Sequence, residues 1–151
     1  MTHIVRPATM SDFGAVSPLL QDLGRGELNE ASEQVYRERF ARHLARTETA
    51  SLVAEVDRQI VGFISIEFRE RLNRSKPEAW VPDLIVGEES RGQGLGRALL
   101  LAAFDIAREH GCYRLTLESG HSRDAAHRLY LANGMQEEGS FFGIELSPSK
   151  S

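Results

Sequence analysis

Short alternations of apolar and polar residues predict the strands of this chain. Ile64, Ile66 and Phe68 fall on one face of such a segment, opposite Phe63 and Ser65, because successive side chains of a strand point to opposite sides. The segment FFGIEL, near the C-terminal end, is expected to close the sheet. The predicted strands are residues 3–6, 52–56, 60–68, 80–86, 113–118 and 141–146.

Apolar residues at helical spacing predict four helices. The first begins at a capping signal formed by Thr9 and Asp12, and it contains Pro18, which is expected to kink or split it. The helix at 97–110 is apolar almost all round. Such a helix is buried on more than one side, so we expect it to lie against the sheet.

The order of these elements predicts a mixed α/β fold. Because a helix links the strands 80–86 and 113–118, those two strands are expected to be parallel. Pro82 cannot donate a backbone hydrogen bond, so it indicates a strand start or a bulge. We expect one domain over residues 1–146 and a frayed tail over 147–151.

Composition indicates an ordinary globular protein, with 26% charged and 41% hydrophobic residues. A formal net charge of −4 argues against a general nucleic-acid binder, which would carry a basic face. No stretch approaches the roughly 20 apolar residues of a membrane span, and the N-terminus resembles neither a signal nor a transit peptide. Cys112 is the only cysteine, which favours a reducing compartment. We therefore expect a cytoplasmic protein with no nucleic-acid or membrane partner.

The strongest chemical signal is a glycine-rich turn between the strand 80–86 and the helix 97–110. Gly92, Gly94 and Gly96 allow a ligand to approach the backbone closely, because they carry no Cβ. The first amides of the following helix are unpaired donors in a region of partial positive charge, and Arg91 and Arg97 add full charges. This combination favours a phosphate-binding loop.

Two familiar glycine motifs do not fit this turn. A dinucleotide fingerprint needs G-x-G-x-x-G, but the third glycine position counted from Gly92 is Arg97. A P-loop needs a Gly-Lys pair, and the chain contains none.

The spacing Arg91-x-x-Gly94-x-Gly96 resembles instead the pyrophosphate-binding motif of the GNAT superfamily of acyl-CoA-dependent N-acyltransferases. Asp83 precedes Arg91 by eight residues, as in the fourth strand of that family, and AHRLYLANGM (126–135) is similar to its closing motif. The matches cover nearly the whole chain in the expected order.

The resemblance implies a GNAT fold: a mostly antiparallel, twisted sheet of six to seven strands, with the fourth and fifth strands parallel and splayed around the CoA site, flanked by about four helices. It also implies acetyl-CoA as co-substrate. No metal is expected, because the sequence shows no metal-ligand spacing. The residues that it places around CoA are Leu84, Ile85, Val86, Arg91, Gly92, Gln93, Gly94, Leu95, Gly96, Arg97, Arg123 and Tyr130.

The same resemblance assigns roles in acyl transfer. Tyr130 corresponds to the tyrosine that assists the departing thiolate, and the backbone amides of residues 84–86 would polarise the thioester carbonyl. Many family members carry Asn where this chain has Arg123, which could hold a phosphate instead.

The general base is left open by the sequence. Asp83 is slightly favoured over Glu118 and Glu67, and each carboxylate could act through a water or attract an ammonium substrate. His121 and His127 could also serve near neutral pH.

We therefore expect an N-acetyltransferase that transfers the acetyl group of acetyl-CoA to a primary amine of a small molecule, by direct attack in a ternary complex. The alternatives are an acetyltransferase of protein N-termini or lysines, and a non-catalytic acyl-CoA-binding regulatory domain. A homodimer is expected, because family members are commonly dimers and the predicted last strand needs cover. The identity of the amine is not encoded in any motif.

Overall fold

The computed structural model describes residues 2–23, 30–118 and 124–146. Contacts divide the chain into two compact units, Met1–Leu117 and Glu118–Ser151, and each is described by itself. The expected tail at 147–151 lies outside the described residues.

Among its described residues, the first unit contains a sheet and three α-helices. Its elements are β1 (His3–Pro7), η1 (Met10–Asp12), α1 (Phe13–Gln21), α2 (Glu30–Ala45), β2 (Thr49–Val56), β3 (Gln59–Arg69), β4 (Glu78–Val86), η2 (Glu88–Ser90), α3 (Leu95–Glu109) and β5 (Arg114–Leu117). The second unit contains α4 (Asp124–Ala132), and Gly134, two residues after the end of this helix, adopts the left-handed conformation (φ +89°). No helix in the described ranges is long and apolar enough to cross a membrane.

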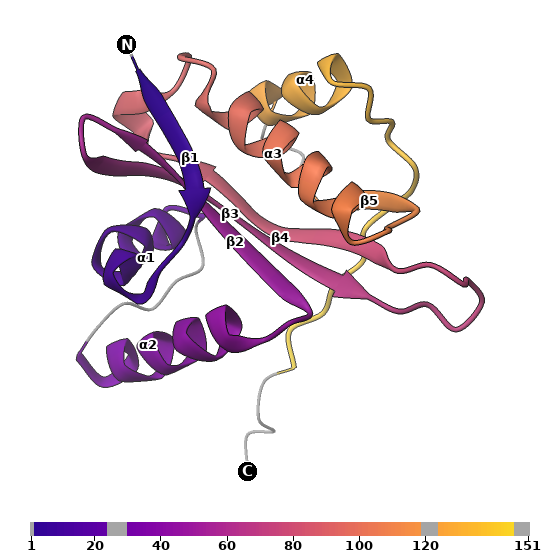
Figure 1. The fold of residues 1–151 in the computed structure, drawn as a ribbon, viewed down its shortest axis with the longest axis horizontal. Coiled ribbons are helices and arrows are strands. Elements are labelled where there is room, and N and C mark those ends of the chain that lie inside the picture. Colours follow the sequence, from indigo (N-terminus) through magenta and orange to yellow (C-terminus); the bar gives the residue numbers. More distant parts are fainter. Residues whose placement is uncertain (1, 24–29, 119–123, 147–151) are drawn as a thin grey trace. The chain divides into compact units, whose positions relative to one another are not determined.

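The five strands form one sheet in the order β1-β2-β3-β4-β5 (Figure 1). Neighbours from β1 to β4 are antiparallel, whereas β4 and β5 are parallel. A parallel pair needs a crossover connection, and α3 supplies it. The parallel pair is therefore confirmed.

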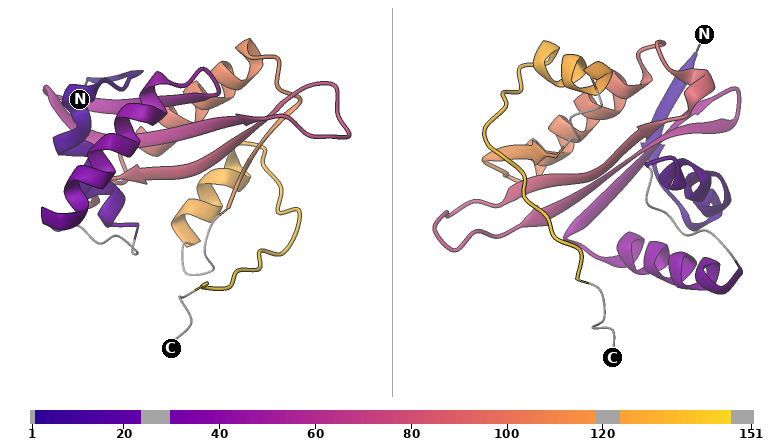
Figure 2. Two further views of the ribbon diagram at one scale, coloured as in Figure 1. Left: turned by 90° about the horizontal axis from the view of Figure 1, so that it is seen from below. Right: turned by 180° about the vertical axis from the view of Figure 1, so that it is seen from behind.

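Helices pack on both sides of this sheet. α1 and α2 lie on one side, here called the α2 face, and α3 lies on the other, the α3 face (Figures 1 and 2). On the α3 face, one cluster contains Leu52, Ala54, Ile64, Ile66, Ala79, Val81, Leu95, Leu99, Ala103 and Ala107. On the α2 face, a second cluster contains Phe13, Val16, Leu19, Phe40, Val53, Phe63 and Ile85. Burial of each large apolar side chain contributes about 1.5–3 kcal/mol.

Of the two alternatives for Pro82, the bulge is confirmed and the strand start is wrong, because β4 begins at Glu78 and its register shifts between Trp80 and Asp83. Ser65 of β3 pairs with Asp83, but Glu67, two residues further along β3, pairs with Trp80, three residues back along β4. The additional residue reverses the alternation of β4. Trp80 and Asp83 therefore lie on the same face, although residues three apart in a regular strand point to opposite faces.

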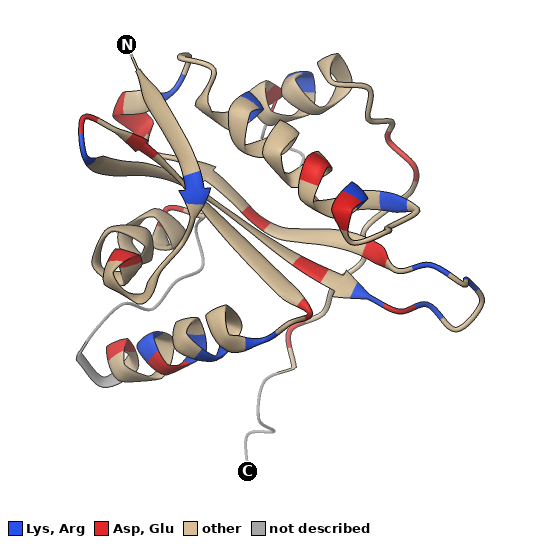
Figure 3. Ribbon diagram, in the orientation of Figure 1, with Lys and Arg blue, Asp and Glu red and all other residues tan. Residues whose placement is uncertain are grey.

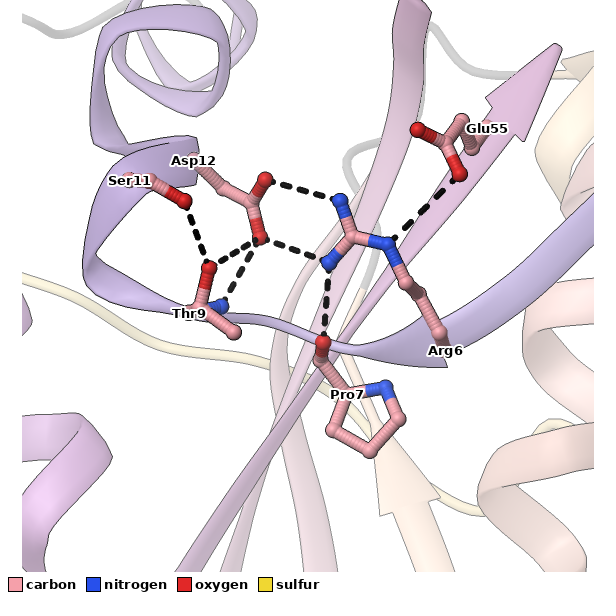
Figure 4. A network of polar contacts seen from close by, with 6 residues as sticks. All are labelled: Arg6, Pro7, Thr9, Ser11, Asp12 and Glu55. Carbon is pink, nitrogen blue, oxygen red and sulfur yellow. Dashed lines mark hydrogen bonds and ion pairs between the residues drawn. The ribbon is translucent and has the colours of Figure 1, made fainter. Parts of the chain in front are cut away.

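A polar network fixes the start of the first helical segment (Figure 4). Both terminal nitrogens of Arg6 donate to the Asp12 carboxylate at 2.9 Å, and the Thr9 amide donates to it at 2.8 Å. Arg6 Nε lies 3.6 Å from a carboxylate oxygen of Glu55 in β2. The hydrogen bonds from Arg6 lower the pKa of Asp12 below its ordinary value. The start signal at Thr9 and Asp12 is confirmed.

Pro18 lies inside α1 and does not split it. Proline removes one backbone hydrogen bond, while Val16 and Leu19 of the same helix remain buried in the core.

The predicted strand at 141–146 is wrong for the described chain, and the sheet has five strands rather than six or seven. No described segment forms a ladder with these residues, although a strand needs a neighbour for its backbone hydrogen bonds. Their large apolar side chains are exposed to solvent, Phe142 by 89% and Leu146 by 88%. The apolar residues of this segment alternate as in a strand, but the segment forms no strand because no described segment pairs with it.

Candidate active site

The glycine-rich turn leads directly into α3. Gly92 (φ +78°) and Gly94 (φ +81°) adopt the left-handed conformation that favours glycine, and Gly94 is the N-cap of the helix. A Cβ at either position would meet no atom within 4 Å, so the side of the loop is open. The first helical bond runs from the Ala98 amide to the Gly94 carbonyl at 3.0 Å. The amides before Ala98 are thus the unpaired donors of a helix N-terminus.

The side chains of this loop differ in their surroundings. Arg91 Nε donates to the Val86 carbonyl at 3.0 Å, which ties the loop to the end of β4. Gln93 and Arg97 are exposed, whereas Leu95 is buried in the core against the α3 face. Leu95 therefore offers a ligand its backbone amide rather than its side chain.

The second half of β4 has one open edge within the first unit. Pairing with β5 ends at Val81 opposite Leu117, whereas pairing with β3 continues to Val86 opposite Gly62. Residues 82–86 consequently have a strand neighbour on one side only, among the residues that the structure describes. This edge contains the predicted positions Leu84, Ile85 and Val86, and it leads to the glycine-rich turn.

Asp83 lies at the start of that open edge, on the α2 face. Its carboxylate is half-buried and accepts a 2.7 Å hydrogen bond from the hydroxyl of Ser65, a residue only 3% exposed on the neighbouring strand. Glu67 is also half-buried on this face, two residues beyond Ser65. The structure thus brings together two of the three carboxylates that the sequence proposed as bases.

The remaining predicted residues belong to the second unit or lie outside the described ranges. Tyr130 is half-buried in α4, one turn after His127, and its backbone carbonyl accepts from the amides of Asn133 and Met135, both at 3.1 Å. Glu118 follows β5 directly. Arg123 and His121 lie outside the described residues.

Sequence reasoning did not identify Ser65 as the partner of Asp83. A small polar residue at a buried position between Phe63 and Glu67 is a signal that could have indicated it. It also missed Trp80, Arg69 and Glu78, because without the bulge Trp80 would lie on the opposite side from Asp83. Within the described ranges, no group of three His, Cys, Asp or Glu side chains is arranged to hold a metal ion.

Comparisons with known proteins show the family of this chain. The model of the acetyltransferase (GNAT) family matches residues 16–135. An uncharacterized N-acetyltransferase of Bacillus subtilis is 32% identical over 138 residues, 91% of this chain and 92% of that protein. An aminoalkylphosphonate N-acetyltransferase of Salmonella typhimurium is 30% identical over 133 residues, 88% of this chain and 84% of that protein.

A solved structure, a putative acetyltransferase from Agrobacterium tumefaciens, superposes with a TM-score of 0.83 at 26% identity and covers 95% of this chain and 99% of its own. The chain therefore belongs to the GNAT family of acetyltransferases, whose members use acetyl-CoA.

Proposed function

We propose that this acetyltransferase transfers the acetyl group of acetyl-CoA to a primary amine of a small molecule, by direct attack in a ternary complex. The observation that carries the proposal is the open edge of β4, which starts at the carboxylate of Asp83 and leads to the glycine-rich turn. One end of this edge suits an ammonium group and the other suits a pyrophosphate.

The glycine-rich turn and the first amides of α3 would bind the pyrophosphate of acetyl-CoA, assisted by the charge of Arg97. Arg91 would act mainly by holding the turn against Val86. Arg123 is proposed as a further contact to CoA. Backbone amides of residues 84–86 would hold the pantetheine arm and donate to the thioester oxygen, where negative charge develops during attack.

In the proposed reaction, the amine nitrogen attacks the thioester carbonyl carbon, and the carbon–sulfur bond then breaks with its electron pair on sulfur. The second proton that the nitrogen loses in forming the amide ends on the thiolate through solvent, which gives the free thiol of CoA. The proton of the substrate ammonium passes to Asp83, directly or through a water, and Ser65 keeps the carboxylate oriented. Tyr130 donates a hydrogen bond to the departing thiolate. Glu118 is the alternative base, because it directly follows the strand that pairs with β4.

A small amine is favoured over a peptide by two considerations. The relative from Salmonella typhimurium, which matches most of this chain, is named for a small aminoalkyl substrate. In addition, Asp83 and Glu67 lie in successive rows of one sheet face, and two acidic positions so placed suit a compact ammonium group.

The proposal includes a homodimer in the cytoplasm. The four apolar side chains of the segment 141–146 are exposed, and cover by a second copy would remove them from water. The single cysteine suits a reducing compartment.

Measurement of thiol release from acetyl-CoA across amines, amino acids, polyamines, aminoglycosides and peptides tests the function. We expect release that depends on both acetyl-CoA and a small primary amine. Binding of acetyl-CoA without thiol release for any amine would favour a non-catalytic domain.

A further inference from the structure

The α2 face becomes polar along the strands with increasing distance from its apolar core. The strand register arranges its residues in successive rows: Val53, Phe63 and Ile85; then Ser51, Ser65 and Asp83; then Thr49, Glu67 and Trp80; and last Arg69 and Glu78. The first row is packed under α1 and α2, so the polar rows follow directly after the core.

Charge changes sign along these rows. Asp83 and Glu67 form an acidic part, and beyond Trp80 the guanidinium groups of Arg69 and Arg71 face the single carboxylate of Glu78. Figure 3 shows acidic positions within β3 and β4, and a hairpin between them in which basic positions outnumber acidic ones. Two cations against one anion leave this end basic.

The side chains of the basic end are held in place by contacts with one another. Glu78 is 4% exposed and accepts from Arg71 and Thr116, each at 3.1 Å, while a nitrogen of Arg69 lies 3.6 Å away. The guanidinium carbon of Arg69 lies 4.7 Å from the centre of the Trp80 ring. Arg69 is thus held against Trp80, with its position fixed from two sides.

Buried polar atoms without a hydrogen-bond partner lie on the same side of the sheet. In the described ranges, four buried side-chain polar atoms have no hydrogen-bond partner, and all lie here: Ser51 Oγ, Arg69 Nε, Trp80 Nε1 and, from α2, His43 Nε2. Ser51 is only 6% exposed and pairs with Ser65 on the side of β3 away from Asp83. Buried polar groups are normally paired, and the N–H groups of Arg69 and Trp80 need an acceptor.

We infer that the acceptor amine of this enzyme also carries an anionic group, a phosphonate, phosphate or carboxylate, which binds at Arg69 and Trp80 while the amine binds at Asp83. This inference rests on the proposed function. One step of two residues along a strand is about 7 Å, and that step separates the Asp83 row from the Trp80 row. Two or three carbon atoms between the amine and the acid, together with a hydrogen bond of about 3 Å at each end, can span this separation.

The same arrangement discriminates against an amine that lacks the acid. A neutral substrate would leave the N–H groups of Arg69 and Trp80 without an acceptor, and a site built to bond a polar group rejects analogues without it. A hydrogen bond to a charged group contributes about 1.5–3 kcal/mol, which is about 10- to 100-fold in kcat/KM. Arg69 is therefore assigned as a specificity-determining residue.

Three amines with the same two-carbon spacing test the inference: propylamine, β-alanine and 2-aminoethylphosphonate. In the thiol-release assay we expect kcat/KM for at least one acidic amine to exceed that for propylamine by about 10-fold or more. The two acidic amines distinguish a carboxylate from a phosphonate as the preferred anion.

Arg69→Gln should reduce the ratio of kcat/KM for the preferred acidic amine to that for propylamine by about 10- to 100-fold. Because both rates come from one preparation, this ratio does not depend on the folded fraction. Arg74→Gln is the matched control, since Arg74 lies in the same hairpin, against Tyr113 rather than Trp80, and should leave the ratio unchanged. Arg69→Lys should give an intermediate ratio, because lysine keeps the charge but not the fork of donors.

The outcomes separate this inference from the proposed function. Equal kcat/KM for propylamine and both acidic amines, or an unchanged ratio in Arg69→Gln, overturns the anionic group while leaving the small-amine function intact. No thiol release with any amine overturns the proposed function and this inference with it.

Discussion

Tyr130 is the residue on which the proposed chemistry depends most. A free thiol has a pKa of about 8.5 and a free phenol about 10, so complete proton transfer from phenol to thiolate is uphill by roughly 2 kcal/mol. We therefore assign Tyr130 a hydrogen bond to the leaving thiolate rather than complete protonation. Such a bond strengthens as charge develops on sulfur, and it lowers the barrier for that reason.

Tyr130→Phe should lower kcat by about 10²–10⁴-fold while the affinity for acetyl-CoA barely changes, because the lost bond forms mainly in the transition state. Rates are measured beside the folded fraction, under conditions where the chemical step limits turnover. Tyr113→Phe is the matched control, because it removes the hydroxyl of a half-buried tyrosine in the first unit and should keep kcat. Full kcat in Tyr130→Phe would leave this tyrosine a packing residue.

At the scale of single residues, the sequence indicated which residues belong to the site better than it indicated which side chains they contact. Asp83 was favoured as a base, yet its partner Ser65 was not recognised, because a cross-strand pair follows from register rather than from spacing in sequence. The bulge at Pro82 was indicated, but its effect on the direction of Trp80 was not. A second irregularity, where Glu55 of β2 pairs with Ile60, places Ile60 against the α2-face cluster, away from the predicted companions Ile64 and Ile66. Each bulge reverses the side on which the following residues lie.

Among the elements, the glycine-rich turn with α3 was predicted most completely, because its glycines and its apolar helix are local signals. The structure adds that Gly92 and Gly94 have positive φ. A substitution at Gly94 therefore combines two effects, backbone strain and obstruction of the ligand.

Gly94→Val should abolish binding of acetyl-CoA in a protein that still folds. Gly111→Val separates the two effects, since Gly111 also has positive φ (+72°) and open space, but at the far end of α3. We expect both variants to show a lowered melting temperature and only Gly94→Val to lose binding, measured by titration calorimetry. Normal affinity in Gly94→Val would show that the turn has no part in binding.

The N-terminal segment provides a test of stability. Asp12→Asn removes the charge that accepts four hydrogen bonds from Arg6 and Thr9, and should cost about 2 kcal/mol, roughly 5 °C in melting temperature. Asp105→Asn is the control, because its ion pair with Arg108 is exposed and should contribute little.

The Asp12 contribution also depends on pH. Since the folded pKa is depressed, the stabilisation is fully present above the unfolded value of about 3.9 and is lost as the pH falls through the folded value. The difference in melting temperature between the native protein and Asp12→Asn should therefore shrink as the pH falls below about 3.9. A difference that stays constant from neutral pH to pH ~3 would contradict the role of the Arg6 pair.

At the scale of the whole molecule, the segment 141–146 is the clearest failure of sequence reasoning. The alternation of its apolar residues is correct for a strand, but a strand exists only with a neighbour, and periodicity contains no information about neighbours. The proposed homodimer accounts for its exposed side chains.

Light scattering at micromolar concentration should give the mass of a dimer, and Ile144→Asp should shift it toward the monomer, because a charge would be buried in the contact. Asp in place of the exposed Leu72 of the hairpin is the control and should keep the dimer. A native monomer would refute the proposed assembly.

The small-amine function is tested most directly by a competition in one reaction. Acetyl-CoA and the enzyme are mixed with 2-aminoethylphosphonate, β-alanine, propylamine and a peptide that has a free N-terminus and a lysine, and every product is identified by mass spectrometry. We expect the acetyl group on a small amine, in amounts equal to the thiol released, with the peptide unmodified. Acetylated peptide with unmodified small amines would contradict the account.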